Sequence, residues 1–342
     1  MLSAMPAPAA APGMQSAGMD STSSSLESIS SSPTLTPCQI MQLSSLADDE
    51  KEHLLDALRQ AEAEGDSLTP AEASKALKEH MYCKRVVMDI DAAGDGLLTS
   101  EKIAAATHLP EDEREHLEDF LERRDALGAP ITLDEAHEAL EEHREVRRIV
   151  QGLDSDADGL IRMADIASPK VAMPDDARQH LLETCARATS RGAQGVSLEE
   201  AHAALEEHRE VVAIILAIES GEGRLTEHNI AAADGISEDE RLHLLETLSA
   251  AKAAGVELTC DRAHKALELH REVIAIVTAV DPGGDGLISV HNLQAADLSA
   301  PVRACLLKAV ETLAAQGRKL TSDAAHRVLE RTHALWSEDQ KR

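Results

Sequence analysis

Apolar residues along most of the chain recur with the spacing of an α-helix. In one clear example, Val146, Ile149, Val150 and Leu153 stand at positions i, i+3, i+4 and i+7 and therefore share one helix face. No stretch of useful length alternates apolar and polar residues as a half-buried strand would. The pattern predicts an all-α fold.

The same pattern returns along the chain at a nearly fixed interval. Histidines in four matching stretches are 63, 64 and 63 residues apart: His53, His116, His180 and His243. Four glycines have the same spacing: Gly96, Gly159, Gly223 and Gly286. A weaker fifth copy begins at Ala304, where Cys305 takes the histidine position. These matches indicate a tandem repeat with a period near 63 residues.

One segment of the third copy carries the ligand pattern of a calcium loop. Short aspartates at alternate positions of a tight turn can point toward one centre, and Ca²⁺ takes six to eight oxygen ligands. The segment resembles the loop of the EF-hand family. The family positions 1, 3, 5, 6, 7, 8 and 12 are held by Asp154, Asp156, Asp158, Gly159, Leu160 (through its carbonyl), Ile161 and Asp165. A helix-connecting turn without metal is the alternative.

Two residues of this loop depart from the family pattern. Asp165 replaces the usual glutamate and is one methylene shorter, so bidentate ligation is harder to reach. Arg162 places a positive charge beside the site. Both departures predict weak Ca²⁺ binding, micromolar or weaker, and can shift the preference toward Mg²⁺.

The corresponding loops of the other copies keep fewer ligands. Loop 91–102 retains Asp91 and Asp95 but has Lys102 at position 12. Loop 281–292 retains three candidate ligands: Asp281, Asp285 and Asn292. Both loops are further candidates for a metal, and an empty loop is the alternative for each. Loop 218–229 has isoleucine at its first position and is expected to bind none.

Other loops of similar length lie between these and have almost no acidic ligands. The resemblance implies that each pairs with an acidic loop through a short β-bridge at its apolar position 8. From Thr69 to Asp91, and from Thr132 to Asp154, no residue breaks a continuous helix, whereas Pro110 lets the chain double back. We therefore expect each acidic loop to pair with the loop that follows it, and long helices to join the pairs in an extended array. The opposite pairing stays open.

The repeat divides the chain into a tail and five EF-hand-like pairs. The tail is rich in Ala, Pro and Ser and is predicted to be disordered. Residues 35–54 align with 98–117, but Ser-rich sequence replaces the acidic loop, so the first pair is truncated. The predicted parts are the tail 1–33, the first pair with a linking helix 34–90, and the later pairs 91–153, 154–217, 218–280 and 281–342.

Charge and composition exclude several classes of partner. The chain has 62 acidic and 33 basic residues and a net charge of −29, which repels nucleic acid and anionic membranes. Its three aromatic residues are too few for a protein that stacks on bases. The longest apolar run, 211–218, is too short to span a bilayer, and no Sec-type signal is visible. We expect a cytoplasmic protein or one exported by a non-Sec route.

Histidine is abundant, and four histidines stand four residues before a glutamate on a predicted helix. A single i, i+4 pair offers only two ligands for Zn²⁺, so solvent-exposed His–Glu contacts are the expected arrangement. A pH-sensing role for the histidines is the weaker alternative. The pairs are His137 with Glu141, His202 with Glu206, His264 with Glu268, and His326 with Glu330. Five scattered cysteines without a Cys-x-x-Cys spacing argue against disulfides and zinc-thiolate sites.

No nucleophile, phosphate-binding or dinucleotide-binding motif is present, and an enzyme is not expected. The main functional hypothesis is a Ca²⁺-binding EF-hand protein that acts as a regulatory or scaffold module for other proteins. One phenylalanine and few methionines outside the tail disfavour a calmodulin-like opening switch. The alternative is a metal-independent helical scaffold, such as a secreted bacterial effector, with vestigial loops.

Overall fold

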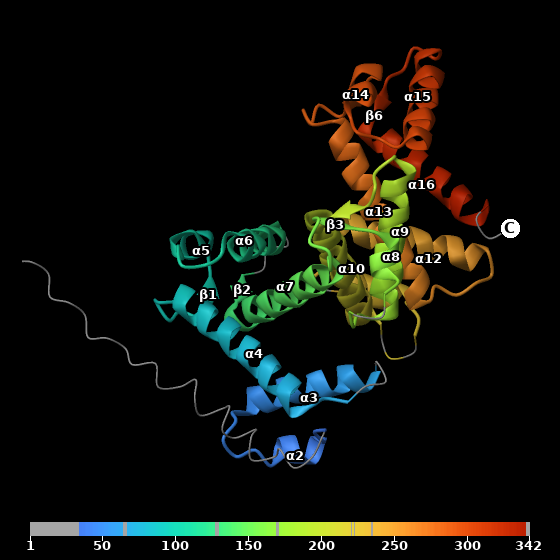
Figure 1. Cartoon of the computed structure of the whole chain (residues 1–342). Helices are drawn as coiled ribbons and strands as arrows, with labels where there is room; N and C mark the ends of the chain where they lie inside the picture. Colours follow the sequence, from blue (N-terminus) through green and yellow to red (C-terminus); the bar gives the residue numbers. More distant parts are fainter. Residues whose placement is uncertain are drawn as a thin grey trace, which may run out of the picture. The chain divides into compact units, whose positions relative to one another are not determined.

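The computed structural model describes residues 34–63, 67–126, 130–168, 171–219, 221, 223–233 and 235–339. Within these ranges the chain is mostly helical, and its strands are two residues long (Figure 1). The all-α prediction is confirmed. The predicted disordered tail lies outside the described residues. The chain divides into two compact units: one holds the residues up to Glu111 with Thr132–Glu141, and the other holds Asp112–Ile131 with the residues from Glu142 on.

The first unit is built on helices α3 and α4, which pack against each other (Figure 1). Thr69 caps α4: its side chain accepts a hydrogen bond from the backbone N–H of Glu72, whose carboxylate accepts one from Thr69 N in return. Leu35 and Leu68 are buried, and the N–H of Leu35 donates to the carbonyl of Leu68 at 2.8 Å. The elements are α2 (Pro37–Met41), α3 (Asp48–Ala63), α4 (Pro70–Ile90), β1 (Leu97–Leu98) and α5 (Ser100–Ala105), followed by the start of α7 (Leu133–Leu153).

The second unit repeats one order of elements: a short strand, a short helix, a helix of 15 or 16 residues, a second strand or bridge, and a long helix. Its first elements are α6 (Glu111–Ala126), β2 (Ile131–Thr132), the rest of α7, β3 (Leu160–Ile161), α8 (Met163–Ile166), α9 (Asp175–Ser190), β4 (Val196–Ser197) and α10 (Leu198–Ile218). Then come α11 (Glu227–Ala232), α12 (Glu238–Ala253), α13 (Cys260–Val280), β5 (Leu287–Ile288), α14 (Val290–Ala295), α15 (Ala300–Ala314), β6 (Leu320–Thr321) and α16 (Ser322–Asp339).

The long helices match the prediction from spacing. Helices α4, α7, α10 and α13 each have 21 residues, and the two predicted uninterrupted stretches are continuous helices. Helix α6 begins directly after Pro110, and Ser237 caps α12 by accepting a hydrogen bond from the N–H of Glu240. Helix boundaries are therefore set by local capping chemistry that the sequence displays.

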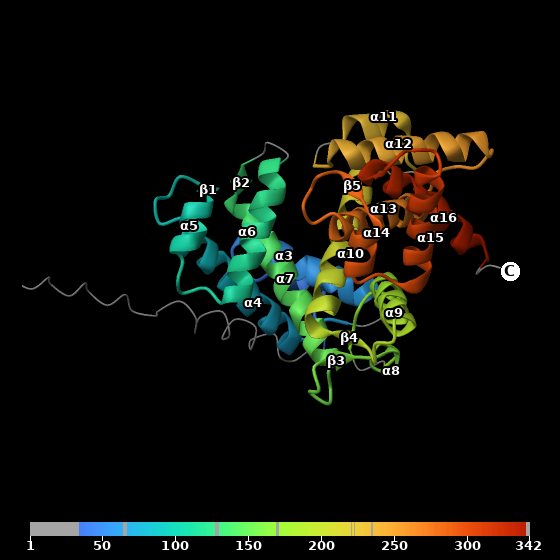
Figure 2. The same cartoon turned by 90° about the horizontal axis from the view of Figure 1, so that it is seen from above.

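In the second unit, each acidic loop meets the loop that follows it, as expected from the spacing. Strands β3 and β4 lie side by side (Figure 2) and are antiparallel, with Ile161 opposite Val196. Strands β5 and β6 are also antiparallel and place Ile288 opposite Leu320. Arg224 forms an isolated antiparallel bridge with Thr259. These pairings bury the apolar residues of position 8, which anchor the hydrophobic cores below each strand pair.

Candidate metal sites

Loop 154–165 brings its three predicted aspartates together. One carboxylate oxygen from each of Asp154, Asp156 and Asp158 lies within 4.8 Å of the others. The carboxylate of Asp154 accepts hydrogen bonds from the N–H groups of Asp158 and Gly159 at 3.1 and 3.2 Å, which curls the loop around it. Gly159 has a φ of +79°, a conformation that glycine adopts without steric cost. Leu160 lies in β3, opposite Ser197.

The two residues that depart from the family pattern both make contacts within this loop. The Arg162 guanidinium lies 2.5 Å from Asp158 Oδ2 and 3.9 Å from Asp156 Oδ2. This guanidinium lowers the pKa of Asp158. Asp165 turns to the start of α8, where its carboxylate accepts a hydrogen bond from Arg162 N at 2.9 Å. The positively charged Arg162 side chain therefore lies beside the aspartates of the loop, and Asp165, its twelfth residue, acts as a helix cap.

Loop 91–102 is closed around a lysine. Lys102 Nζ lies 2.7 Å from Asp91 Oδ1 and 2.7 Å from the carbonyl oxygen of Leu97, and it also contacts Asp95 Oδ1. These oxygens belong to loop positions 1, 5 and 7. The same positions supply calcium ligands in the EF-hand family, which the loop resembles. The hydrogen bond that Lys102 donates lowers the pKa of Asp91 to about 2, and the bonds that it donates to Asp91 and Asp95 raise the pKa of Lys102. The two predicted ligands meet, but around an ammonium group.

In loop 281–292 the two aspartate side chains accept hydrogen bonds, mostly from backbone N–H groups of the same loop. Asp281 accepts hydrogen bonds from Asp285 N and Gly286 N at 3.2 and 2.8 Å and from the hydroxyl of Ser322 at 3.0 Å. Asp285 accepts one from the N–H of Leu287. The third predicted ligand, Asn292, accepts a hydrogen bond from Ser289 N at 3.0 Å and caps α14. The side-chain amide of Asn292 therefore caps the N-terminus of α14.

The histidine–glutamate pairs are not solvent-exposed contacts, and that expectation is wrong. Each pair meets two further histidines, which lie about 60 and about 90 residues before the glutamate in the chain. Glu268 on α13 illustrates the arrangement: its Oε1 lies 2.7 Å from His180 Nδ1, 2.9 Å from His208 Nδ1 and 3.3 Å from His264 Nε2. Helices α9, α10 and α13 thus direct three imidazole rings at one carboxylate oxygen.

Four such clusters lie in the described part of the chain, and we call them the His–Glu clusters. In each, a central histidine is at most 5% exposed and its ring contacts the rings of both other histidines, with centroids 4.2–4.9 Å apart. Their members, with the central histidine second, are His53, His80, His137 and Glu141; His116, His143, His202 and Glu206; His180, His208, His264 and Glu268; and His243, His270, His326 and Glu330.

An aspartate lies on the far side of each central histidine. His270 Nε2 is 3.1 Å from Asp239 Oδ2, and the same contact in the other clusters measures 3.5–3.6 Å. The other three aspartates are Asp49, Asp112 and Asp176. Each stands four residues before the cluster's first histidine, so one turn of the same helix supplies both groups.

Burial and hydrogen bonding shift the protonation of these groups in opposite directions. Burial lowers the pKa of His243, so this ring favours its neutral form. Burial alone would raise the pKa of Glu268, but hydrogen bonds from His180 and His208 outweigh it and hold that pKa below the usual range. For His80, contacts with Glu141 and Asp49 outweigh burial and raise the pKa. Each glutamate is therefore an anion held by imidazole groups.

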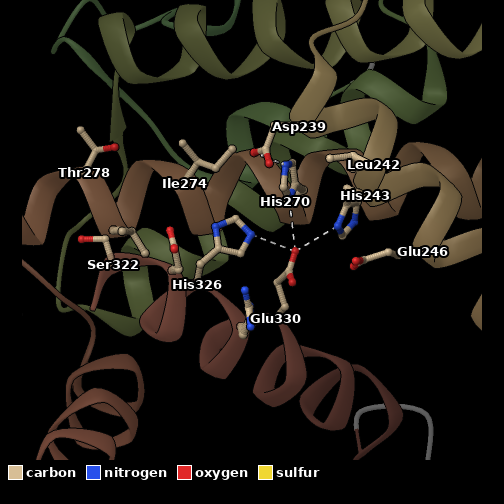
Figure 3. Close-up of a pocket in the computed structure, with 13 residues that line it drawn as sticks. Asp239, Leu242, His243, Glu246, His270, Ile274, Thr278, Ser322, His326 and Glu330 are labelled. Carbon is tan, nitrogen blue, oxygen red and sulfur yellow. Dashed lines mark hydrogen bonds and ion pairs between the residues drawn. The ribbon is translucent and has the colours of Figure 1, made fainter. Parts of the chain in front are cut away.

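The last cluster is open to solvent. It lines a pocket of about 340 Å³ between α12, α13 and α16, in which His243, His270 and His326 all point at Glu330 (Figure 3). The fifth helix pair, α15 and α16, has no such cluster among its described residues. Cys305 and Thr332 occupy the two histidine positions there, and Sγ and Oγ1 lie 3.3 Å apart.

The sequence contains a signal for these clusters beyond the i, i+4 His–Glu pairs. The central histidines His80, His143, His208 and His270 share the repeat spacing with the histidines of α3, α6, α9 and α12. Three histidines per copy at fixed spacing predict a common environment. Which copies supply each cluster depends on packing between helices that are far apart in the sequence.

No family model, curated protein or solved structure matches this chain. None of the described helices is both long and apolar enough to cross a membrane.

Proposed function

We propose that this protein is a helical scaffold, built from tandem EF-hand-like pairs, that binds a helix of another protein. The observation that carries the proposal is an apolar groove of about 660 Å³ between α15 and α16. Leu313, Leu320 and Val328 contribute apolar surface to it.

The groove corresponds to a surface that another helix covers in the preceding pair. Cys305 and Thr332 line the groove and stand at the repeat positions of His243 and His270. In the preceding pair, those two histidines contact Glu330 of α16, which packs on α13. Helix α13 packs on α10 in the same way. The last pair thus presents a surface of a kind that accepts a helix elsewhere in this chain.

Charge indicates the chemistry of the partner helix. The groove lining includes Lys308, Arg327 and Arg331 and, among its described residues, no carboxylate, although the chain as a whole has a net charge of −29. An amphipathic helix with acidic residues complements this surface. Helix α4 of a second copy fits less well, because Ser74 and Lys78 stand where α7 has His137 and Glu141.

A labelled peptide tests this proposal on the full chain. Residues 198–218 form an amphipathic, glutamate-rich helix of the required type and serve as the probe. We expect micromolar binding by fluorescence anisotropy and at least about tenfold weaker binding to Arg331→Glu, because reversing the charge repels the peptide. Leu216→Glu, at an exposed position outside the groove, is the control and should bind normally. Equal binding to Arg331→Glu and the unmodified chain would contradict the proposal.

A second candidate function is Ca²⁺ binding at loop 154–165, and the convergence of its three aspartates favours it. The ion would have a secondary role in this scaffold. Lys102 already neutralises the aspartates of loop 91–102, and Arg162 contacts two of those in loop 154–165. Because lysine and arginine side chains already balance the charge of these aspartates, we infer that the fold forms without calcium.

A further inference from the structure

The His–Glu cluster on α12, α13 and α16 has a donor set typical of a transition-metal site. His243 Nδ1, His270 Nδ1 and His326 Nε2 lie 3.0, 3.2 and 3.0 Å from the same atom, Glu330 Oε1 (Figure 3). Three imidazole nitrogens and a carboxylate oxygen are ligands that Zn²⁺ and related divalent ions accept. The four groups come from three helices, so a bound ion would cross-link them.

Hydrogen bonds from neutral imidazole rings do not satisfy this arrangement. A carboxylate oxygen offers two lone pairs, yet three ring nitrogens converge on Glu330 Oε1. His270 is also held between two carboxylates, Glu330 at Nδ1 and Asp239 at Nε2. A neutral ring has one N–H, so one of its nitrogens faces a carboxylate oxygen lone pair to lone pair. Either a second proton on His270 or a metal cation between His270 Nδ1 and Glu330 removes that conflict.

The four aspartates lie where a metal site commonly has carboxylates that hydrogen-bond to its histidine ligands. A metal-bound histidine commonly donates its other ring N–H to a carboxylate, which fixes the tautomer and orients the ring. Asp239 lies at that position for His270, and Asp49, Asp112 and Asp176 lie at it in the other clusters. The carboxylate is within hydrogen-bond distance at His270, and in the other three clusters it lies 3.5–3.6 Å from a buried Nε2 that has no hydrogen-bond partner among the described residues.

The spacing of three donors is compatible with a zinc site, because ligand atoms of His243, His270 and Glu330 all lie within 4.8 Å of one another. Zinc bonds of about 2.0–2.1 Å place neighbouring ligand atoms roughly 3.3 Å apart. Contacts to the glutamate in the α12–α13–α16 cluster measure 3.0–3.2 Å, so small side-chain shifts would admit the ion. The pocket beside Glu330 gives this cluster a route from solvent.

We propose that each of the four His–Glu clusters binds one divalent transition-metal ion, such as Zn²⁺, through its three histidines and its glutamate. The ion ties the long helix that carries the His–Glu pair to the two helices that carry the other histidines. This assignment is independent of Ca²⁺ binding at loop 154–165 and of the groove between α15 and α16.

Zinc titration of the metal-free full chain tests the proposal. With Zn²⁺ as the probe and a chromophoric chelator as competitor, we expect four tightly bound ions per chain. Glu330→Gln keeps the shape of the side chain but removes its charge, and it should reduce the number to three. His243→Phe also should give three, because phenylalanine preserves the ring contact with His270 but offers no ligand.

Two further measurements make the result decisive. Asp156→Ala is the control, since it alters only the calcium loop and should still bind four Zn²⁺. Far-UV circular dichroism shows whether each variant keeps its helices, so that loss of a site is separated from loss of the fold. The proposal is overturned if the unmodified chain binds fewer than four Zn²⁺, or if the folded Glu330→Gln and His243→Phe variants both still bind four. Either result would identify at least some of the clusters as hydrogen-bonded contacts between helices.

Discussion

At the scale of single residues, the side chain at the twelfth position has a different role in each of two acidic loops. In loop 91–102 that residue is Lys102, whose ammonium group contacts the oxygens of Asp91, Asp95 and Leu97. In loop 154–165 it is Asp165, which is occupied as a helix cap. The side chain that is longest and positively charged reaches the loop centre, while the short anionic one does not. This difference gives a direct test by substitution.

Replacing Lys102 with glutamate should create a Ca²⁺ site. The change removes the ammonium group from Asp91 and Asp95 and supplies the carboxylate that EF-hand loops use at this position. Because position 3 is Ala93, we expect a dissociation constant on the order of 10⁻⁴ M. Calorimetry should show one more Ca²⁺ per chain in Lys102→Glu. Lys102→Met, which removes the charge without adding a ligand, is the matched control, and a gain there equal to that of Lys102→Glu would refute this explanation.

At the scale of helices and loops, much of the structure could be predicted from local sequence. The uninterrupted stretch from Thr69 to Asp91 forms one helix, and Pro110 precedes the start of another, because capping and helix breaking are local effects. The position of the three aspartates of loop 154–165 was also predictable, because the chain bends at Gly159. The contacts of His208 with Glu268 were not, since they depend on how α10 packs against α13.

A buried ion pair joins α12 to α13. Arg271 donates to Glu240 Oε1 from Nε and Nη2, at 2.8 and 2.6 Å, and its Nη2 also contacts Glu210 at 3.2 Å. Only 11% of the Glu240 side chain is exposed. Its carboxylate would be left without this partner if the arginine were removed.

We expect Arg271→Ala to lower the free energy of unfolding by about 3–5 kcal/mol, because truncating one partner leaves a buried charge uncompensated. Urea denaturation followed by circular dichroism measures the loss. Lys252→Ala removes an exposed contact with Glu227 and should change the free energy by less than about 1 kcal/mol. Similar losses in the two variants would show that the Arg271–Glu240 pair is not a major tie between these helices.

At the scale of the whole molecule, the two ends of the repeat differ from its interior. Helix α4 has Ser74 and Lys78 where later long helices have the His–Glu pair, and the last pair has Cys305 and Thr332 where earlier pairs have two histidines. A complete cluster needs histidines from one copy and a His–Glu pair from the next copy. The first copy lacks the His–Glu pair, and the last copy lacks the two histidines. Altered contact surfaces are expected at the terminal copies of a helical repeat. The stability of such a repeat comes from apolar cores and from contacts between successive helices. Calcium is therefore expected to add only modestly to it.

Calcium should stabilise the chain modestly but should not be required for folding. The cores beneath the strand pairs are apolar, and Lys102 and Arg162 already provide positive charge to two loops. We therefore expect the same helicity by circular dichroism in excess chelator and in 1 mM Ca²⁺. If the site in loop 154–165 has a dissociation constant near 10 µM, 1 mM Ca²⁺ adds about 2.7 kcal/mol, which should raise the melting temperature by several degrees. Asp156→Ala should abolish this increase. Loss of helicity in chelator would show that the fold depends on the ion, and an undiminished increase in Asp156→Ala would place the ion at another site.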